Sequence, residues 1–111
     1  MRPTRELHSV YSPRELRRLL ESGSFVSEHK LKRLFEEENF RLLHHRRFQS
    51  LTIREIEVLR LIALGETNQQ ISEKLFVSAD TVRTHRNRIW QKLEIKNLVG
   101  AIRFASAFDL I

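Results

Sequence analysis

Apolar residues recur three and four positions apart along most of the chain, which is the spacing of one face of an α-helix. From residue 51 onward this pattern divides into four segments, at about 53–65, 68–75, 79–93 and 98–109. Alternating runs of β-branched residues, which indicate strands, are missing, and there are only three glycines and two prolines. We therefore expect an all-α protein.

Each of the four segments begins after a residue whose side chain can cap a helix. In the first two, a Glu or Gln stands three residues after the threonine, which is the spacing of a capping box. Gly65 is placed to end the first helix. The predicted N-caps are Thr52, Thr67, Ser78 and Asn97.

Residues 1–50 predict a helical N-terminal arm, and we place the domain boundary at about Ser50. The segment Ser12-Pro13-Arg14-Glu15 combines an N-cap, an N1 proline and a Glu at N3, and Gly23 can end the helix that follows. A longer helical pattern then runs to about Arg47. The arm can pack on residues 51–111, form a dimerising hairpin or be the remnant of a regulatory region, and the sequence leaves these alternatives open.

Composition narrows the kind of partner. Twenty Lys and Arg residues against fourteen Asp and Glu give a net charge of +6, which favours an anionic partner such as nucleic acid. The chain has no cysteine, so disulfides and thiolate chemistry are excluded. Neither a signal peptide nor a run of about 20 apolar residues is present, so we expect a cytoplasmic, nucleoid-associated protein and no membrane partner.

The polar residues do not suggest catalysis or metal binding. His44 and His45 are adjacent, and neighbouring helical side chains point about 100° apart, so the two cannot converge on one ion. No glycine-flanked nucleophile or phosphate-binding loop is present. We therefore expect no enzymatic activity, no catalytic residue, no metal site and no cofactor.

The short helix at 68–75, the turn and the longer helix at 79–93 have the layout of a helix-turn-helix. Residues 82–92 include four basic residues and no acidic one. Arginine can read guanine, asparagine can read adenine and threonine can contact the thymine methyl group. Arg83, Thr84 and Asn87 share one helical face, opposite Val82 and Ile89, and are therefore candidate base readers.

The segment LTIREIEVLRLIALGETNQQISEKLFVSADTVRTHRNRIWQKLEI, followed by KNLVGAIRFA, resembles the four-helix DNA-binding domain of LuxR-type (GerE-type) bacterial transcription regulators. The resemblance covers residues 51 to about 106, roughly half of the chain. It implies a helix-turn-helix at residues 68–93 with a recognition helix starting near Asp80. It also implies a fourth helix that pairs two subunits on a two-fold related DNA site.

By this resemblance Arg83 and Asn87 fall where the family presents base-contacting side chains, with Thr84 beside them, and Asp80 lies one turn earlier. The Asp80 carboxylate would repel phosphate unless it caps its helix or accepts from a cytosine amino group. His85 is either a phosphate contact or a half-buried histidine, and Trp90 is expected to pack. The expected phosphate contacts, including the outward basic residues of the recognition helix, are Thr67, Asn68, Ser78, Thr81, His85, Arg86, Arg88 and Lys92.

The last helix carries two apolar lines. Leu98, Ala101, Ile102 and Ala105 are expected to face the core. A second line at i, i+4, i+7 and i+11 would be exposed in a monomer, so it predicts a homodimer interface. This line consists of Gly100, Phe104, Ala107 and Ile111.

These patterns predict a sequence-specific double-stranded DNA-binding transcription regulator that works as a homodimer, with RNA polymerase as a further candidate partner. One alternative is the promoter-reading domain of a sigma factor, which has a similar Leu-Thr-x-Arg-Glu opening; the fourth helix at about 97–108 argues against it. The other is a protein-interaction module with incidental DNA affinity. Such a module would bind all DNA sequences alike.

Overall fold

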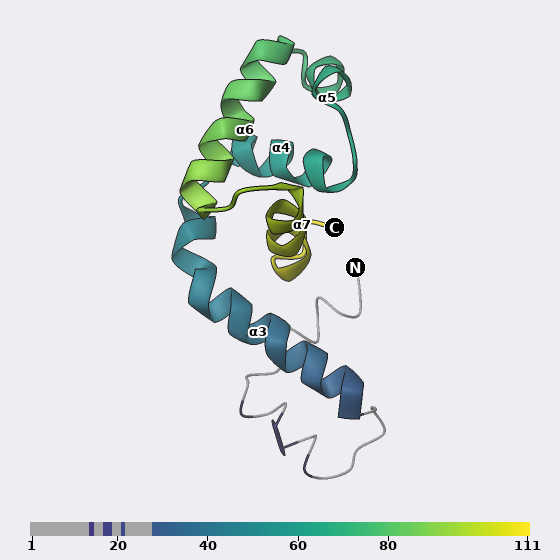
Figure 1. The fold of residues 1–111 in the computed structure, drawn as a ribbon, viewed down its shortest axis with the longest axis vertical. Coiled ribbons are helices and arrows are strands. Elements are labelled where there is room, and N and C mark those ends of the chain that lie inside the picture. The colour runs from purple at the N-terminus through teal and green to yellow at the C-terminus, as the bar shows by residue number, and fades with distance from the viewer. Residues whose placement is uncertain (1–13, 15–16, 19–20, 22–27) are drawn as a thin grey trace. The chain divides into compact units, whose positions relative to one another are not determined.

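The computed structural model describes residues 14, 17, 18, 21 and 28–111. In this part of the chain all regular structure is helical, which confirms the all-α prediction (Figure 1). The helices are α3 (Glu28–Gln49), α4 (Ile53–Ala63), α5 (Asn68–Leu75), α6 (Ala79–Leu93) and α7 (Leu98–Ala107). None of these helices has the length and hydropathy needed to cross a membrane. The helix expected between Ser12 and Gly23 lies largely outside the described residues.

The chain forms two compact units, residues 1–44 and 45–111. In the first unit, Leu31 and Leu34 of α3 are buried, while Leu42 and Leu43 are exposed. The last turn of α3 belongs to the second unit. The domain boundary that the sequence suggests, at about Ser50, stays a prediction.

Two contacts fix the last turn of α3 within the second unit. The ring of Phe48 stacks on that of Phe108, with 4.1 Å between the ring centroids. The Nε atom of Arg47 lies 2.9 Å from a carboxylate oxygen of Glu94, the residue that ends α6. The Ser50 hydroxyl donates to the Arg47 carbonyl at 2.6 Å and closes the helix. The second unit therefore contains the last turn of α3 in addition to the four helices expected from the sequence.

The helix starts lie where the capping residues predict them. Both capping boxes are complete, because Glu55 and Gln70 accept from the backbone N–H of Thr52 and Thr67 at 2.8 Å in return. Gly65 follows α4 with a φ of +90°, a conformation that glycine adopts without strain. The observed N-caps are Thr52, Thr67, Ser78 and Asn97.

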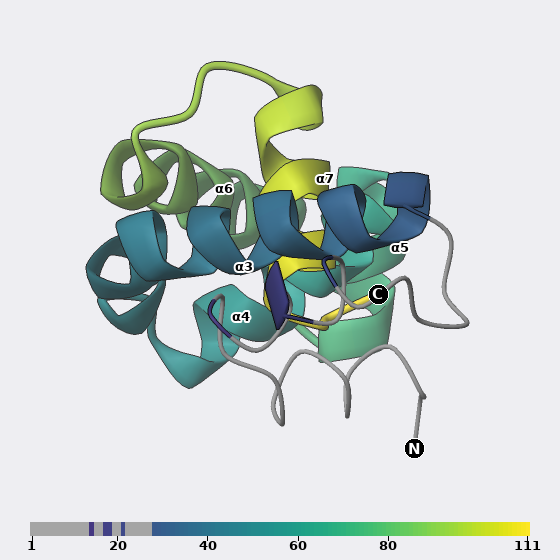
Figure 2. The ribbon, with the colours of Figure 1, turned by 90° about the horizontal axis from the view of Figure 1, so that it is seen from below.

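The core of the second unit is built around α4, which contacts α5, α6 and α7 (Figure 2). Val82 and Ile89, which the sequence places opposite the candidate readers, are buried in α6, and so is Leu93. On α4 the residues Ile56 and Ala63 are only half-buried, and the buried apolar positions are Val58, Leu59, Leu61 and Ile62. The other buried apolar residues of this core are Leu51, Ile71, Ala101, Phe104, Ala105 and Ala107.

One buried ion pair joins α4 to α6. Glu55 is 2% exposed, and its Oε1 atom accepts from Lys92 Nζ at 2.7 Å and from the Thr52 backbone N–H at 2.8 Å. Burial alone would raise the pKa of Glu55. The hydrogen bonds from Lys92 and Thr52, together with the charge of Lys92, outweigh burial and hold this pKa below its ordinary value of 4.5. Glu55 is therefore a charged residue that helps to hold α6 on α4.

The faces of α7 are assigned only in part by the sequence pattern, since Ala101 and Ala105 are buried as expected. Phe104 and Ala107, expected on an exposed line, are each only 3% exposed, whereas Leu98 and Ile102, expected in the core, are exposed. The physical reason lies at Gly100. A Cβ atom on Gly100 would come within 2.8 Å of the Ile95 side chain, so this face of α7 lies against the segment that joins it to α6. Gly100 and Ile111 are half-buried.

Candidate nucleic-acid interface

Helix α6 separates a buried face from a polar one. Val82 and Ile89 are completely buried, which fixes the rotation of the helix about its own axis. Arg83, Thr84 and Asn87 all lie on the exposed face, as the sequence predicts. The side chains that can read bases are therefore free of core packing, and the packing on the other side holds their backbone in place.

A hydrogen bond joins the two helices of the helix-turn-helix. Arg86 Nη1 on α6 donates to Asn68 Oδ1 at the start of α5 at 3.0 Å. The Arg86 guanidinium also lies over the Trp90 ring, 5.1 Å from its centroid. Trp90 is half-buried, in agreement with its expected packing role. Arg86 and Asn68 therefore act as a bridge across the motif, in addition to any contact with phosphate.

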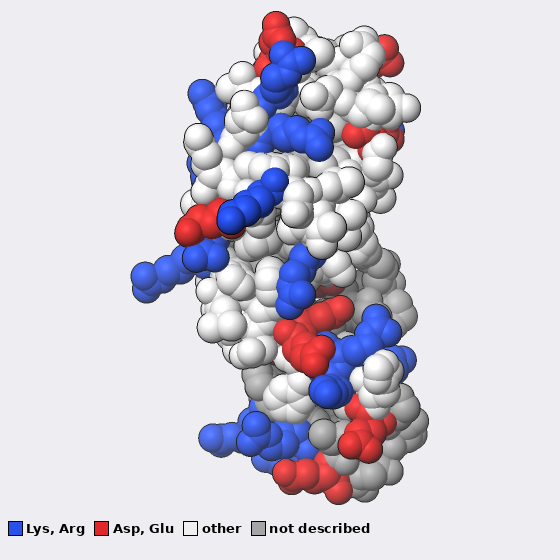
Figure 3. All heavy atoms as spheres, in the orientation of Figure 1, with Lys and Arg blue, Asp and Glu red and all other residues white. Residues whose placement is uncertain are grey.

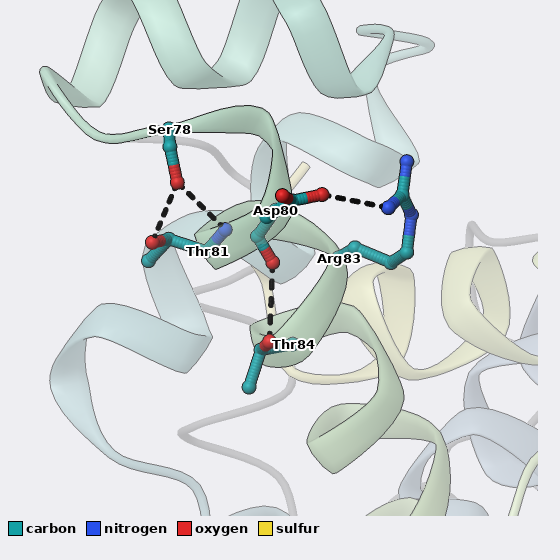
Figure 4. Close-up of polar contacts among 5 residues, drawn as sticks. All are labelled: Ser78, Asp80, Thr81, Arg83 and Thr84. Atoms are coloured by element: carbon teal, nitrogen blue, oxygen red, sulfur yellow. Dashed lines mark hydrogen bonds and ion pairs between the residues drawn. The ribbon is translucent and has the colours of Figure 1, made fainter.

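The first turn of α6 holds a cluster of polar side chains (Figure 4). The Ser78 hydroxyl accepts from the Thr81 backbone N–H at 3.1 Å and lies 2.9 Å from the Thr81 hydroxyl. The Thr84 hydroxyl donates to the Asp80 carbonyl at 3.1 Å. The Asp80 carboxylate accepts from Arg83 Nη1 at 2.8 Å. Ser78, and not Asp80, is thus the residue that caps this helix.

The surface over α6 is rich in basic side chains, as the space-filling view shows (Figure 3). Asp80 is the single acidic residue in the sequence of α6, and it is already paired with Arg83. Arg88 is exposed on the same helix. A surface of this kind attracts the phosphate backbone of a nucleic acid.

Three of the residues expected to contact phosphate are partly buried or already have a partner within the domain. Thr67 is exposed, but its hydroxyl already accepts from the Gln70 backbone N–H at 3.1 Å. His85 is half-buried, and its Nδ1 atom is buried without a hydrogen-bond partner among the described residues. Lys92 is bound to Glu55 and therefore has a structural partner inside the domain. These roles toward phosphate stay predictions.

Sequence reasoning missed three contacts that shape this surface. The Asp80–Arg83 pair has an i, i+3 spacing, which the sequence could have indicated. The Arg86–Asn68 and Lys92–Glu55 contacts join residues 18 and 37 positions apart. No local signal marks such pairs, because they form only when the helices pack.

The described residues contain no group of three or more His, Asp or Glu side chains that could hold a metal ion. The polar groups on α6 are donors and acceptors spread along one helix face. This arrangement is typical of a surface that binds an extended partner.

The fold and the polar face of α6 define a helix-turn-helix nucleic-acid-binding domain. The sequence profile of the bacterial regulatory proteins of the luxR family matches residues 49–105, just over half of the chain. The chain therefore belongs to the LuxR family of bacterial regulatory proteins, a family of regulators and not of enzymes. This match favours the LuxR-type interpretation over the sigma-factor alternative.

Curated relatives share this segment. The chain is 47% identical to the oxygen regulatory protein NreC of Staphylococcus carnosus over 58 residues, which are 52% of this chain and 27% of that protein. It is 43% identical to the transcriptional regulatory protein LiaR of Bacillus subtilis over 63 residues, 57% and 30% of the two chains. For the DNA-binding transcriptional activator EvgA of Escherichia coli the identity is 42% over 59 residues, 53% and 29% of the chains. The chain thus matches less than a third of each relative's length.

Proposed function

We propose that this protein is a sequence-specific double-stranded DNA-binding transcription regulator that reads the major groove with α6. The observation that carries the proposal is the exposed Arg83, Thr84 and Asn87 on the face of α6 opposite its buried stripe. A helix of this kind fits the major groove with its N-terminal half toward the base edges. The relatives NreC, LiaR and EvgA, whose names describe regulators, support the same role.

Each reader is suited to a different base. Arg83 can pair with guanine O6 and N7, and Asn87 can pair with adenine N6 and N7. The Thr84 hydroxyl proton is already donated to the Asp80 carbonyl, so this side chain offers its methyl group and an acceptor oxygen. Thr84 is therefore the reader of a thymine methyl group.

Contacts with phosphate hold the helix in register. Arg88 and the hydroxyl cluster of Ser78 and Thr81 lie on or beside the exposed part of α6. Thr67, Asn68, His85 and Arg86 complete this set around the motif. If six phosphates are neutralised per subunit, log affinity falls with log salt at a slope of about −5.

The protein binds a two-fold related DNA site as a homodimer through α7. The large apolar side chains of α7 that are exposed in the single chain are Leu98, Val99 and Ile102, of which Val99 is 74% exposed. These residues replace Phe104 and Ala107 as the proposed interface, because the latter two lie in the core. A second copy can cover this apolar face by an isologous helix pair, which matches the symmetry of an inverted repeat.

Selection of bound duplexes from a randomised DNA library at about 150 mM salt tests this function. We expect the wild-type protein to enrich an inverted repeat. The Asn87→Ala variant should lose the preference for adenine at one position in each half-site. Its binding to the selected site should weaken by about 1 to 3 kcal/mol. Asn39→Ala is the matched control, because Asn39 is an exposed helical asparagine outside the segment that matches the family.

Two outcomes would contradict the proposal. Retention of DNA at low salt without any enriched sequence would support the interaction-module alternative. Equal behaviour of Asn87→Ala and Asn39→Ala on the selected site would show that α6 does not read bases through Asn87. Contact with RNA polymerase stays a prediction that this experiment does not address.

A further inference from the structure

The Asp80–Arg83 pair is an unusual feature for a surface that binds DNA. The Asp80 side chain is 87% exposed, yet its carboxylate accepts from Arg83 Nη1 at 2.8 Å (Figure 4). Both residues lie in the part of α6 that would enter the groove. A carboxylate at this place repels phosphate, so its presence calls for a compensating role.

The geometry gives Asp80 such a role. The guanidinium carries five N–H donors in a rigid fork, and the contact with Asp80 occupies one amino group. The remaining donors can form the two parallel hydrogen bonds to guanine O6 and N7. A long side chain that is already oriented loses less conformational entropy when it binds.

The other roles open to Asp80 are less well supported. Ser78 caps α6, so the carboxylate is not needed as a cap. Direct acceptance from a cytosine amino group would have to use the second carboxylate oxygen, Oδ2, because Oδ1 already accepts from Arg83. We propose that Asp80 is a specificity-determining positioning residue that orients Arg83 toward a guanine and disfavours binding to DNA that lacks this guanine. This inference rests on the proposed function.

The weaker binding to DNA that lacks this guanine follows from the charges of Asp80 and Arg83. On the cognate site Arg83 contacts the base and remains close to Asp80, so the carboxylate keeps its partner. On other sequences Arg83 must turn toward phosphate, which leaves Asp80 unpaired near the negatively charged backbone. When DNA displaces water from this surface, the local dielectric constant falls. The attraction between Asp80 and Arg83 and the repulsion between Asp80 and phosphate both become stronger. The pair therefore widens the gap between specific and nonspecific affinity.

The test compares Asp80→Asn with Glu57→Gln. Glu57 forms an i, i+3 pair with Arg54 at 3.3 Å on α4, so its substitution removes the same charge from the same kind of pair outside the reading helix. Dissociation constants are measured on the selected operator, on the operator with the guanine replaced, and on random DNA. We expect Asp80→Asn to bind random DNA several-fold more tightly and to discriminate about tenfold less at the guanine. Glu57→Gln should keep the wild-type discrimination.

A second variant separates positioning from direct reading. In an Arg83→Ala background, Asp80→Asn should cause no further loss of discrimination at any base pair, because a positioning residue acts through Arg83. A further loss at a cytosine in that background would overturn the proposal and make Asp80 a direct reader. Unchanged guanine discrimination in Asp80→Asn would also overturn it while leaving the proposed function intact. Failure of the wild-type protein to select any sequence would instead contradict the proposed function itself.

Discussion

Replacing Lys92 with methionine tests how much the buried ion pair between α4 and α6 contributes to the stability of the domain. Glu55 is 2% exposed, so removal of the ammonium group leaves a largely buried carboxylate without a counter-charge, held only by its hydrogen bonds to Thr52. Breaking a buried pair by removing one partner costs about 3 to 5 kcal/mol. We expect the free energy of unfolding of Lys92→Met to fall by this amount at about pH 7.

The pH dependence of the free energy of unfolding tests the contribution of the Glu55–Lys92 pair. In the wild-type protein the pKa of Glu55 is lower in the folded than in the unfolded state. The stability that the pair contributes is therefore fully present above the ordinary pKa and is lost as the pH falls through the lowered value. In Lys92→Met burial is no longer outweighed by Lys92, so the pKa of Glu55 should rise. The difference in stability between the two proteins should consequently shrink as the pH falls from about 7 to about 3.

Urea unfolding followed by far-ultraviolet circular dichroism over this pH range measures these free energies. Lys74→Met is the matched control, because Lys74 pairs with Glu66 at the surface and such pairs contribute about 0 to 1 kcal/mol. The double variant Glu55→Gln, Lys92→Met should regain part of the loss, since it leaves no buried charge. The reasoning is refuted if Lys92→Met costs no more than Lys74→Met, or if its deficit grows as the pH falls.

Two further predictions concern the DNA-bound protein. Thr84→Val keeps a methyl group on α6 and should preserve the preference for thymine, whereas Thr84→Ser should weaken binding to that site by about 1 kcal/mol, or about fivefold. Binding to operators with thymine and with uracil at this position measures the effect, and equal loss in both variants would contradict a methyl contact. Ile102→Glu should lower affinity for two half-sites about tenfold or more and leave a single half-site unaffected, with the exposed Ile53→Glu as control. Loss of half-site binding as well would show that Ile102 supports the fold of the domain.

The sequence predicts the start of each helix in the second unit because the interactions responsible are local. A capping residue and the backbone N–H that it accepts from lie three positions apart, as for Thr52 and Glu55. The ends of α5 and α6 carry no comparable signal. Both are closed by residues in the left-handed region, Phe76 with a φ of 57° and Glu94 with a φ of 55°, where glycine would be the usual choice. The hydrogen bonds that close them, from Val77 N–H to the Ser72 carbonyl and from Ile95 N–H to the Trp90 carbonyl, involve only the backbone and leave no mark in the side-chain pattern.

The two functional helices differ in how far sequence alone can describe them. In α6 the apolar positions Val82, Ile89 and Leu93 all point inward, so the opposite face could be assigned from periodicity. In α7 apolar residues lie all around the helix, and the rotation depends on the approach of Gly100 to Ile95. Periodicity cannot decide between two apolar faces, and only the packing of the whole domain does so. The surface proposed to read bases is thus encoded within one helix, whereas the face proposed for a second subunit is set by tertiary contacts.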